Sequence, residues 1–243
     1  MSPARSRYLQ TRALVVGSMR YREADRILTL YTRERGRLSA LVKGVRRTKS
    51  RVGGRVEPFS LIEAQLYRGT AGSLYTLTGV ETTRTFMGAR DTLFRMQAGA
   101  RLLDVVKRAF PEEERHIEAF FLLVRSIAAL SEAGDAEAAE RVVASARAKL
   151  MLALGYLPQL NTCVRCGSRE NLHAFHPGMG GVVCSACCPG ETHEYFLFSS
   201  SGFAALRSVL EHPVDEVGVM ELSAEATREV GRVIGRLLEF HGH

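Results

Sequence analysis

Tryptophan is missing from this 243-residue chain, and cysteine is confined to one short stretch. Stacking on a planar ligand would therefore depend on tyrosine or phenylalanine. No apolar run reaches the roughly 18 residues that a membrane helix needs, and the first ten residues lack the apolar core of a secretory leader. These absences predict a cytoplasmic protein that neither spans a membrane nor is exported.

Signatures of catalysis are also scarce. The chain has no G-x4-G-K-[ST] loop for nucleotide phosphates and no H-x-E ahead of a cysteine pair, as zinc deaminases have. Its basic N-terminal region has no acid cluster for a two-metal nuclease. We therefore predict a protein that binds and positions other molecules and is not an enzyme.

Positive charge is concentrated at the start of the chain. Residues 1–60 hold 15 Lys and Arg against 4 Asp and Glu, a balance of +11, whereas residues 61–243 have a balance of −4. A localised basic region points to a polyanion, most often a nucleic acid. A solvated, arginine-rich surface without a ligand is the plainer alternative.

The five cysteines form two C-x2-C pairs with a short spacer. They read C-V-R-C-G from Cys163 and, after the seventeen residues that follow the second cysteine, C-S-A-C-C. Two such knuckles can bring four thiolates to one tetrahedral ion, and zinc is the natural occupant. We predict Zn2+ ligands at Cys163, Cys166, Cys184 and Cys187. Four thiolates leave no open position for water, so the metal is expected to be structural.

Other interpretations of the cysteine segment stay open. Cys188 could replace Cys187 after a small shift, and His173 and His176 lie in the spacer as further ligands. A disulfide framework is disfavoured because five is an odd number and no secretory leader is present. Free or redox-active thiols are a third possibility.

The first part of the chain has the pattern of a small β-barrel. Five β-rich runs are separated by glycines, at Arg12–Val16, Arg26–Thr32, Arg37–Val42, Phe59–Tyr67 and Ser73–Thr78. Five short strands favour an OB-fold, the common barrel for binding single strands, with an SH3-like barrel as the competitor. Tyr21, Tyr31, Phe59, Tyr67 and Tyr75 are available for stacking, but none is assigned, since strand aromatics more often fill cores.

Basic residues in this region form two sets. A hairpin turning at Gly36 would project Arg33, Arg35 and Arg37 outward. A glycine-punctuated loop then carries six cations and no acid, namely Lys43, Arg46, Arg47, Lys49, Arg51 and Arg55. We expect this loop to lie along a phosphate backbone, with a log–log salt slope of roughly −4 on single strands. A charged loop without a ligand is the alternative.

Helical periodicity begins at about Arg84. One helix is expected to end before Pro111, a second to begin near Ile117, and a third to run from Asp135 as N-cap to Gly155 and Pro158. Apolar positions marking the first two are Leu93, Met96, Leu102, Leu103, Val106, Phe110, Ile117, Phe120, Phe121, Val124, Ile127 and Ala128. Ser199 and Ser223 are expected to cap two final helices that return to this bundle.

The predicted architecture is therefore a multidomain α+β protein. Residues 1–80 are expected to form the OB-fold-like, nucleic-acid-binding barrel, and 81–158 with 199–243 the helical domain. Residues 159–198 are expected to be a zinc module inserted between its helices.

With these parts assembled, the chain resembles the DNA repair protein RecO family, the bacterial recombination mediators. The resemblance covers nearly the whole length and is carried by ALVVGSMRYREADRILTLYTRERGRLSALVKGVRRTKS, EPFSLIEAQLYRG, LGYLPQLNTCVRCG and GGVVCSAC. It implies an N-terminal OB-fold, a helical domain and, in many members, a zinc module on this cysteine pattern. Some members lack these cysteines, so the metal is not essential to the shared activity.

The resemblance also implies a function. It implies binding of single- and double-stranded DNA, annealing of complementary strands, and loading of recombinase onto strands coated by single-strand-binding protein. RecR and the tail of the single-strand-binding protein are the implied partners, and the nucleoid is the implied site of action. Two alternatives are a protein–protein adaptor that binds partner peptides on its helices and a regulator that recognises a duplex sequence.

Overall fold

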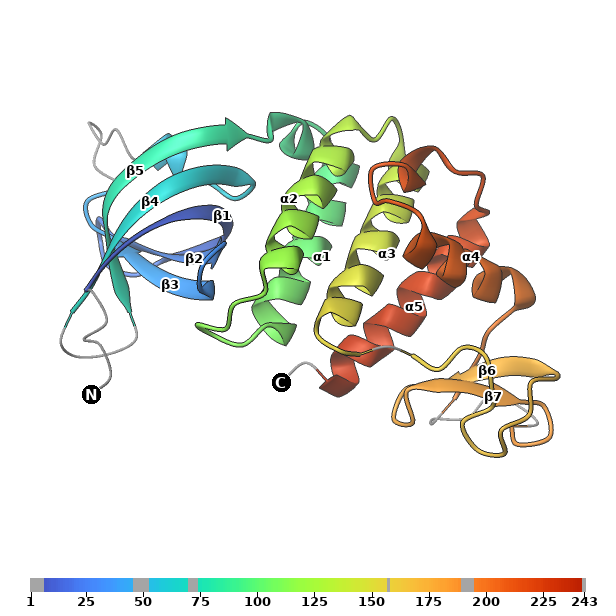
Figure 1. Cartoon of the computed structure of the whole chain (residues 1–243). Coiled ribbons are helices and arrows are strands. Elements are labelled where there is room, and N and C mark those ends of the chain that lie inside the picture. The colour runs from blue at the N-terminus through green and yellow to red at the C-terminus, as the bar shows by residue number, and fades with distance from the viewer. Residues whose placement is uncertain (1–6, 46–52, 70–73, 157, 189–194, 242–243) are drawn as a thin grey trace, which may run out of the picture.

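The computed structural model describes residues 7–45, 53–69, 74–156, 158–188 and 195–241. Its parts follow the chain from a barrel to a helical layer and a small sheet, after which the last two helices return to the layer. A β-barrel lies at one end, a layer of helices follows, and a small sheet lies beyond and to one side of the helices (Figure 1). No helix among these described ranges combines the length and apolar character needed to cross a membrane.

The barrel has five strands. They are β1 (Tyr8–Arg20), β2 (Arg26–Thr32), β3 (Gly36–Val42), β4 (Ser60–Arg68) and β5 (Tyr75–Thr85). The sheet closes in the order β1-β2-β3-β5-β4, because β1 pairs with both β2 and β4. The prediction of five strands is confirmed.

Strand lengths differ from those expected. The strand β1 has 13 residues and a register shift between Val15 and Gly17. Such a shift lets one strand bend and serve two neighbours. The strand β5 continues to Thr85, where helical periodicity was expected to begin. Its β-branched run, which includes Thr82 and Thr83, favours the extended backbone.

The two faces of the barrel strands have different partners. Residues such as Ala13, Val15 and Leu30 fill the barrel interior. The alternating neighbours Leu14 and Tyr31 point the other way and belong to the core of the helical layer. The barrel is therefore fixed to the helices by a shared apolar core.

Three helices form the first part of the helical layer. After a 3-10 turn at Met87–Arg90 come α1 (Leu93–Ala109), α2 (Ile117–Glu132) and α3 (Ala136–Ala153). The side chain of Asp135 accepts a hydrogen bond from the backbone N–H of Ala138 at 2.7 Å, as an N-cap should. Gly155, with φ of +86°, follows the end of α3 in the conformation that favours glycine there.

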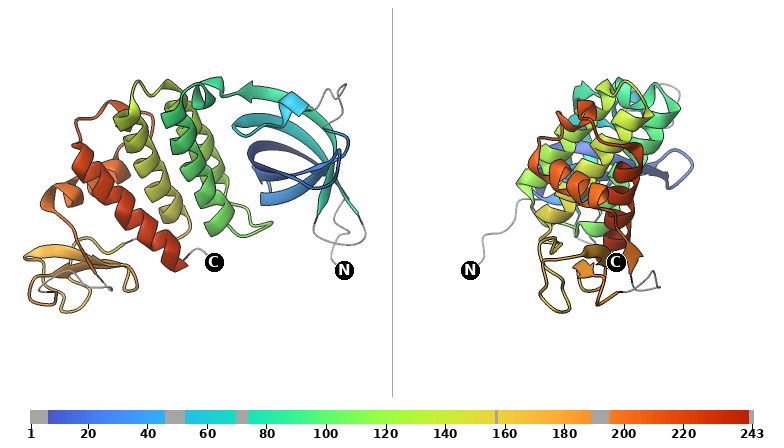
Figure 2. Two further views of the ribbon diagram at one scale, coloured as in Figure 1. Left: turned by 180° about the vertical axis from the view of Figure 1, so that it is seen from behind. Right: turned by 90° about the vertical axis from the view of Figure 1, so that its right-hand side faces the viewer.

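Two later helices return to this layer. They are α4 (Ser200–Glu211) and α5 (Ala224–His241), with a 3-10 turn at Val217–Val219 between them. Ser199 and Ser223 accept backbone hydrogen bonds from Gly202 and Ala226, which confirms both expected caps. Ser145 of α3 donates to the Val209 carbonyl at 2.8 Å, and α5 packs across α3 (Figure 2).

Three apolar positions expected in the helical core are exposed instead. Leu93 is 68% exposed, and Met96 and Phe121 are each 46% exposed. Leu93 is the first residue of α1, and Phe121 faces away from the core, next to the buried Phe120. The predicted buried faces of α1 and α2 therefore included three positions that are exposed in the structure.

The cysteine segment forms a small sheet. It contains β6 (Leu172–His176), β7 (Gly181–Cys184) and β8 (Phe196–Leu197) in the order β7-β6-β8. Residues before the sheet pair with it, as the Gln159 carbonyl accepts from Val182 and Val164 donates to the Val182 carbonyl. This sheet lies between α3 and α4 in the chain, as expected of an insertion.

The barrel meets the helices at the segment between α1 and α2. Gly36, with φ of +62°, approaches the Glu114 carbonyl so closely that any added Cβ would clash with it. Glycine alone accepts such a position readily. Glu113 donates its N–H to the Arg37 carbonyl at 3.0 Å, and Glu112 forms a parallel bridge with Arg37. This segment lies along the part of β3 that β5 leaves uncovered, because β3 pairs with β5 only near Ala40.

Phe59 lies at a second contact between barrel and helices. It was expected to open β4, but it precedes that strand and has a φ of 66°. Its N–H donates to the Val15 carbonyl, and its own carbonyl accepts from Phe86, each at 3.1 Å. Its ring lies against Gly99 of α1, where an added Cβ would stand 2.7 Å from the ring. Phe59 thus serves the junction and is not available for stacking.

Candidate metal centre and basic surfaces

Four thiols converge at one end of the small sheet. The Sγ atoms of Cys163, Cys166, Cys184 and Cys187 all lie within 4.8 Å of one another. Those of Cys166 and Cys184 are 3.6 Å apart. Bonds of about 2.3 Å to a shared tetrahedral ion place sulfur atoms about 3.8 Å apart, so the cluster fits a zinc-sized ion.

Each knuckle holds its cysteines through backbone hydrogen bonds. The N–H of Gly167 donates to the Cys163 carbonyl at 2.9 Å, and the φ of +75° at Gly167 closes that turn. This backbone conformation is one that glycine adopts without strain. In the second knuckle the N–H of Cys187 donates to the Cys184 carbonyl at 3.0 Å. The two knuckles are therefore similar turns that project their sulfurs toward one point.

Local electrostatics favour ionised sulfur at one position. Burial raises the pKa of the Cys163 thiol, but hydrogen bonds from the backbones of Cys184, Cys166 and Arg165 outweigh it and lower that pKa to about 6. Hydrogen bonds among the thiols, first with Cys166, raise the pKa of Cys187 to about 12. Four thiols this close cannot all ionise unless a cation replaces their protons, which is what a metal ion does.

The alternative ligands lie outside the cluster. Cys188 is buried beside it, and its carbonyl is 2.7 Å from Nε2 of His173. The Nδ1 atom of His176 accepts from the N–H of Met179 at 3.2 Å, and its ring lies edge-to-face against Tyr195. Both histidines thus order the backbone around the centre, and the structure groups Cys187 with the other three thiols.

The hairpin arginines do not project together into solvent as expected. Arg37 donates from Nε to the Phe110 carbonyl at 2.8 Å and lies 3.6 Å from Glu112. Arg35 lies 3.8 Å from Glu113. Arg33 is the most exposed of the three, and its guanidinium lies 3.8 Å from Glu34 and 5.6 Å from the ring centre of Phe121. Acids between α1 and α2 hold the other two against the helical layer.

The second basic set lies at the other end of β3. Lys43 follows the last residue of that strand, in a turn where Gly44 donates to the Asp25 carboxylate at 2.8 Å. Arg55 reaches the Val80 carbonyl at 3.4 Å. Neither cation has an ion pair within the described part of the chain. Arg46, Arg47, Lys49 and Arg51 lie outside the described residues.

The barrel aromatics separate into buried and exposed groups. Tyr31 and Tyr75 are buried. Tyr21 is 47% exposed, with Arg22 5.3 Å from its ring centre. Tyr67 lies 5.1 Å from the exposed Tyr8. Tyr8 was not among the expected stacking residues, because its strand begins earlier than the pattern indicated.

The acids Glu112, Glu113 and Glu114 are the functional feature that sequence reasoning missed. Glu113 is 2.9 Å from Arg68 and 3.8 Å from Arg35, so one carboxylate ties two barrel elements to the helices. A run of three acids directly after Pro111, set against a basic N-terminal domain, was the available signal. This run of acids does not by itself indicate which arginines its carboxylates contact.

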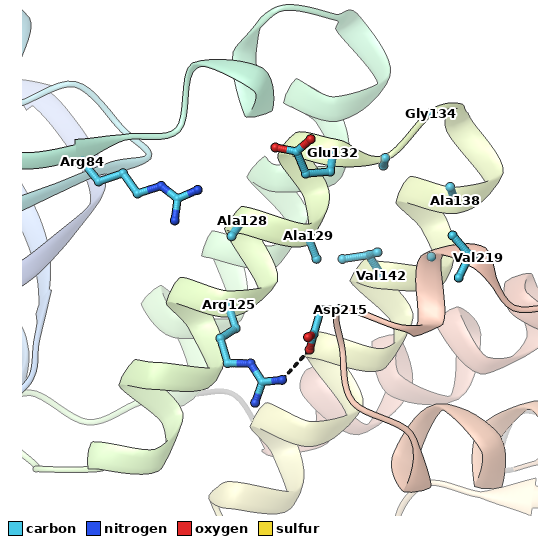
Figure 3. Close-up of a pocket in the computed structure, with 12 residues that line it drawn as sticks. Arg84, Arg125, Ala128, Ala129, Glu132, Gly134, Ala138, Val142, Asp215 and Val219 are labelled. Carbon is cyan, nitrogen blue, oxygen red and sulfur yellow. Dashed lines mark hydrogen bonds and ion pairs between the residues drawn. The ribbon is translucent and has the colours of Figure 1, made fainter.

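A pocket of about 360 Å³ opens where α2 and α3 meet. Figure 3 shows its alanine-rich floor, with Arg84 of β5 on one side and the ion pair of Arg125 with Asp215 on another. Val219, which is 88% exposed, stands at its rim. The lining carries two cations, Arg84 and Arg125, and two acids, Glu132 and Asp215, so the pocket has no marked preference for one sign of ligand charge.

These features define a class of protein in which a β-barrel is fixed to a helical layer and a four-cysteine cluster is able to hold a metal ion. Comparison with known proteins identifies the class more closely. The family model "Recombination protein O N terminal" matches residues 6–86, and "Recombination protein O C terminal" matches residues 90–242. The chain therefore belongs to the recombination protein O (RecO) family.

Individual relatives agree along most of the chain. A protein of Rubrobacter xylanophilus named DNA repair protein RecO is 37% identical over 92% of this chain and 89% of its own length. A protein of the same name from Anaeromyxobacter dehalogenans is 32% identical over 94% and 89%. Another from a Nocardioides species is 41% identical over 72% of each chain.

Proposed function

We propose that this protein is a DNA-binding recombination mediator in DNA repair. It binds single- and double-stranded DNA, anneals complementary strands and helps to load recombinase onto coated single strands. The observation that carries the proposal is the charge balance of +11 over residues 1–60 in a chain that is otherwise slightly acidic, within a family whose relatives are named for DNA repair.

The barrel is the proposed DNA-binding domain. Its strand order, with β1 paired to both β2 and β4 and β3 beside β5, is consistent with an OB-fold. Lys43 and Arg55 flank the basic loop and lack ion pairs among the described residues, so they can meet phosphates without losing a partner. Arg33 is a further contact, whereas Arg35 and Arg37 contribute by holding the hairpin in place.

Annealing requires no covalent step in this proposal. Two strands repel each other through their phosphates, and a basic surface that binds both lowers this repulsion and releases counterions. The protein therefore acts as a non-enzymatic mediator. The cysteine centre is proposed to hold Zn2+, which supplies a closed, structural set of bonds and takes no part in strand pairing.

The same proposal includes the protein partners and the site of action in the cell. RecR and the tail of the single-strand-binding protein are the proposed protein partners, and the nucleoid in the cytoplasm is the proposed site of action. The barrel provides the main DNA contacts in this proposal, and residues 81–158 with 199–243 provide the protein contacts. Residues 159–198 serve as a metal-stabilised module.

Substitution of the loop cations tests this function. Replacing Arg46, Arg47, Lys49 and Arg51 with glutamine removes about four phosphate contacts. The log–log salt slope on single strands should become less steep by about 3, and affinity at roughly 0.15 M salt should fall roughly a hundredfold. Annealing should slow in parallel, as measured by fluorescence of labelled complementary strands.

A matched variant separates local contacts from net charge. It removes the same number of exposed arginines elsewhere, at Arg115, Arg165, Arg169 and Arg236, and should change affinity less than fivefold. If the loop variant bound and annealed DNA like the wild type but lost binding to RecR, the protein would be an adaptor and the proposal would be wrong.

A further inference from the structure

A groove between α1, α3 and α5 is rich in arginine. Its volume is about 470 Å³, and four arginines and two glutamates line it above a floor of small residues: Arg101, Arg147, Arg228, Arg232, Glu140, Glu225, Val143, Ala144 and Gly231. An adjoining cavity of about 330 Å³ shares Arg101 and Arg228 with it, so the two form one elongated depression. The three helices lie beside one another, as the left-hand view of Figure 2 shows from behind.

Arg147 lies at the base of this groove without a full set of partners. Its Nε atom is sealed from solvent and has no hydrogen-bond partner among the described residues. Burial and the neighbouring Arg101 lower the pKa of its guanidinium, and the carboxylates of Asp104 and Glu140 only partly offset this effect. Arg101 in turn is paired with Glu140. An arginine withdrawn from water beside another arginine is stabilised when an anion enters.

The groove is kept open by the absence of a side chain. Gly231 contributes to its lining, and a Cβ added at this position would meet no atom within 4 Å. A glycine inside a helix costs about 1 kcal/mol relative to alanine. Gly231 has no positive φ that would require glycine. Its presence leaves room between α3 and α5 without serving the helix itself.

We propose that this groove binds the phosphodiester backbone of a second nucleic-acid strand. Arg228 and Arg232 stand one helical turn apart on α5, with Arg101 and Arg147 on the facing helices, so three helices supply the cations of the groove. Arg232 also lies 3.6 Å from Glu229. A row of forked donors suits a repeating chain of phosphates. Glu140, which pairs with Arg101, and Glu225 also line the groove, so the four arginines are only partly balanced by acids there.

This inference rests on the proposed function and deepens it. A protein that anneals complementary strands must hold two of them, and the barrel supplies one surface. The groove supplies another on the helical layer, so each chain binds two short strands. The groove thereby assigns a nucleic-acid contact to a region whose overall charge is negative.

The test uses the full chain and two matched variants of α5. Gly231→Leu fills the groove, whereas Gly235→Leu places the same side chain one turn further along, where a Cβ also meets nothing within 4 Å. Both changes favour the helix, so neither should impair folding. Titration with a labelled oligothymidine at concentrations well above its Kd should give two strands per chain for the wild type and Gly235→Leu, and one for Gly231→Leu.

A charge variant and an annealing assay complete the test. The double variant Arg147→Gln, Arg228→Gln should weaken the second binding step roughly tenfold at about 0.15 M salt, as expected for two lost phosphate contacts. Annealing of complementary strands should slow by a similar factor in this variant and in Gly231→Leu.

The outcomes distinguish the two levels of the proposal. If the wild type bound no DNA, the proposed function itself would fail. If the wild type bound and annealed DNA but Gly231→Leu matched Gly235→Leu in both assays, the groove would not be a strand site. Loss of an acidic peptide's binding in Gly231→Leu, with two strands still bound, would assign the groove to a protein partner and overturn the inference.

Discussion

The barrel and the cysteine module are joined to the same helical layer in different ways. The barrel strands and the residues beside them contribute six side chains to the helical core, which are Leu14, Val16, Tyr31, Phe59, Leu61 and Phe86. The module contributes four side chains to that core, which are Leu160, Phe175, Val182 and Phe198, and it also builds a separate small cluster around its own cysteines. Apolar burial therefore fixes the barrel, whereas the module combines a smaller apolar contact with a second cluster around the thiols at its centre.

This difference separates two sources of stability. A buried apolar side chain contributes roughly 2 kcal/mol, so the barrel junction is a sum of many modest terms. Four thiolates on one ion contribute on the order of 10 kcal/mol in a single step. The junction should therefore weaken gradually under substitution, while the module should be lost as a unit.

Loss of the metal centre should have the largest effect. Cys163→Ser or Cys184→Ser removes one ligand, and the stabilisation on the order of 10 kcal/mol that Zn2+ provides should largely disappear. Hydrogen exchange should then become fast over residues 159–188 and stay slow over the barrel. Zinc content by atomic absorption gives the direct measure, and Cys188→Ser should retain a full equivalent. Intact DNA binding together with an unfolded module is expected.

The closest backbone approach at the barrel junction is the next most sensitive point. Gly36→Val places a branched side chain against the Glu114 carbonyl at a positive φ. This change should cost about 3 kcal/mol or more. Gly54→Val is the control, because a Cβ there meets no atom within 4 Å. Urea denaturation measures the free energy of unfolding of both variants. Equal stabilities for the two variants would mean that the α1–α2 segment does not hold the barrel.

Polar contacts at the junction should matter less. Arg37→Met keeps the aliphatic part of the side chain and removes its hydrogen bond to the Phe110 carbonyl and its ion pair with Glu112. The loss should cost about 1.5 kcal/mol. DNA affinity should change less than threefold, since these contacts already occupy Arg37. A tenfold loss of DNA affinity at unchanged stability would return Arg37 to the binding surface.

The smallest effect is expected at Tyr31, where a substitution should raise the free energy of unfolding and not lower it. Its hydroxyl is buried without a hydrogen-bond partner among the described residues, and burial raises the pKa of the phenol. Tyr31→Phe removes the unsatisfied group and keeps the ring against Phe110. Stability should therefore rise by up to about 1 kcal/mol. Thermal denaturation measures this change in stability, with Phe110→Leu as a destabilised comparison.

The helix boundaries and the cysteine cluster could be predicted from the sequence, because each depends on residues that are close together in the chain. The caps at Asp135, Ser199 and Ser223 and the two cysteine knuckles depend on residues within a few positions of one another. The placement of Arg35 and Arg37 could not be predicted, since it depends on acids more than seventy residues away. The exposure of Phe121 was missed for a similar reason, because helical periodicity does not reveal which face meets the barrel.

The segment between α1 and α2 also has a consequence for solubility. The part of β3 that begins at Arg37 would otherwise present unpaired N–H and C=O groups, and such an edge is a template for strand addition from another molecule. Glu112 and Glu113 occupy that edge from the helical layer. A barrel produced without residues 87–243 would expose it together with Leu14 and Tyr31. The helices thus protect the barrel from self-association as well as orienting it.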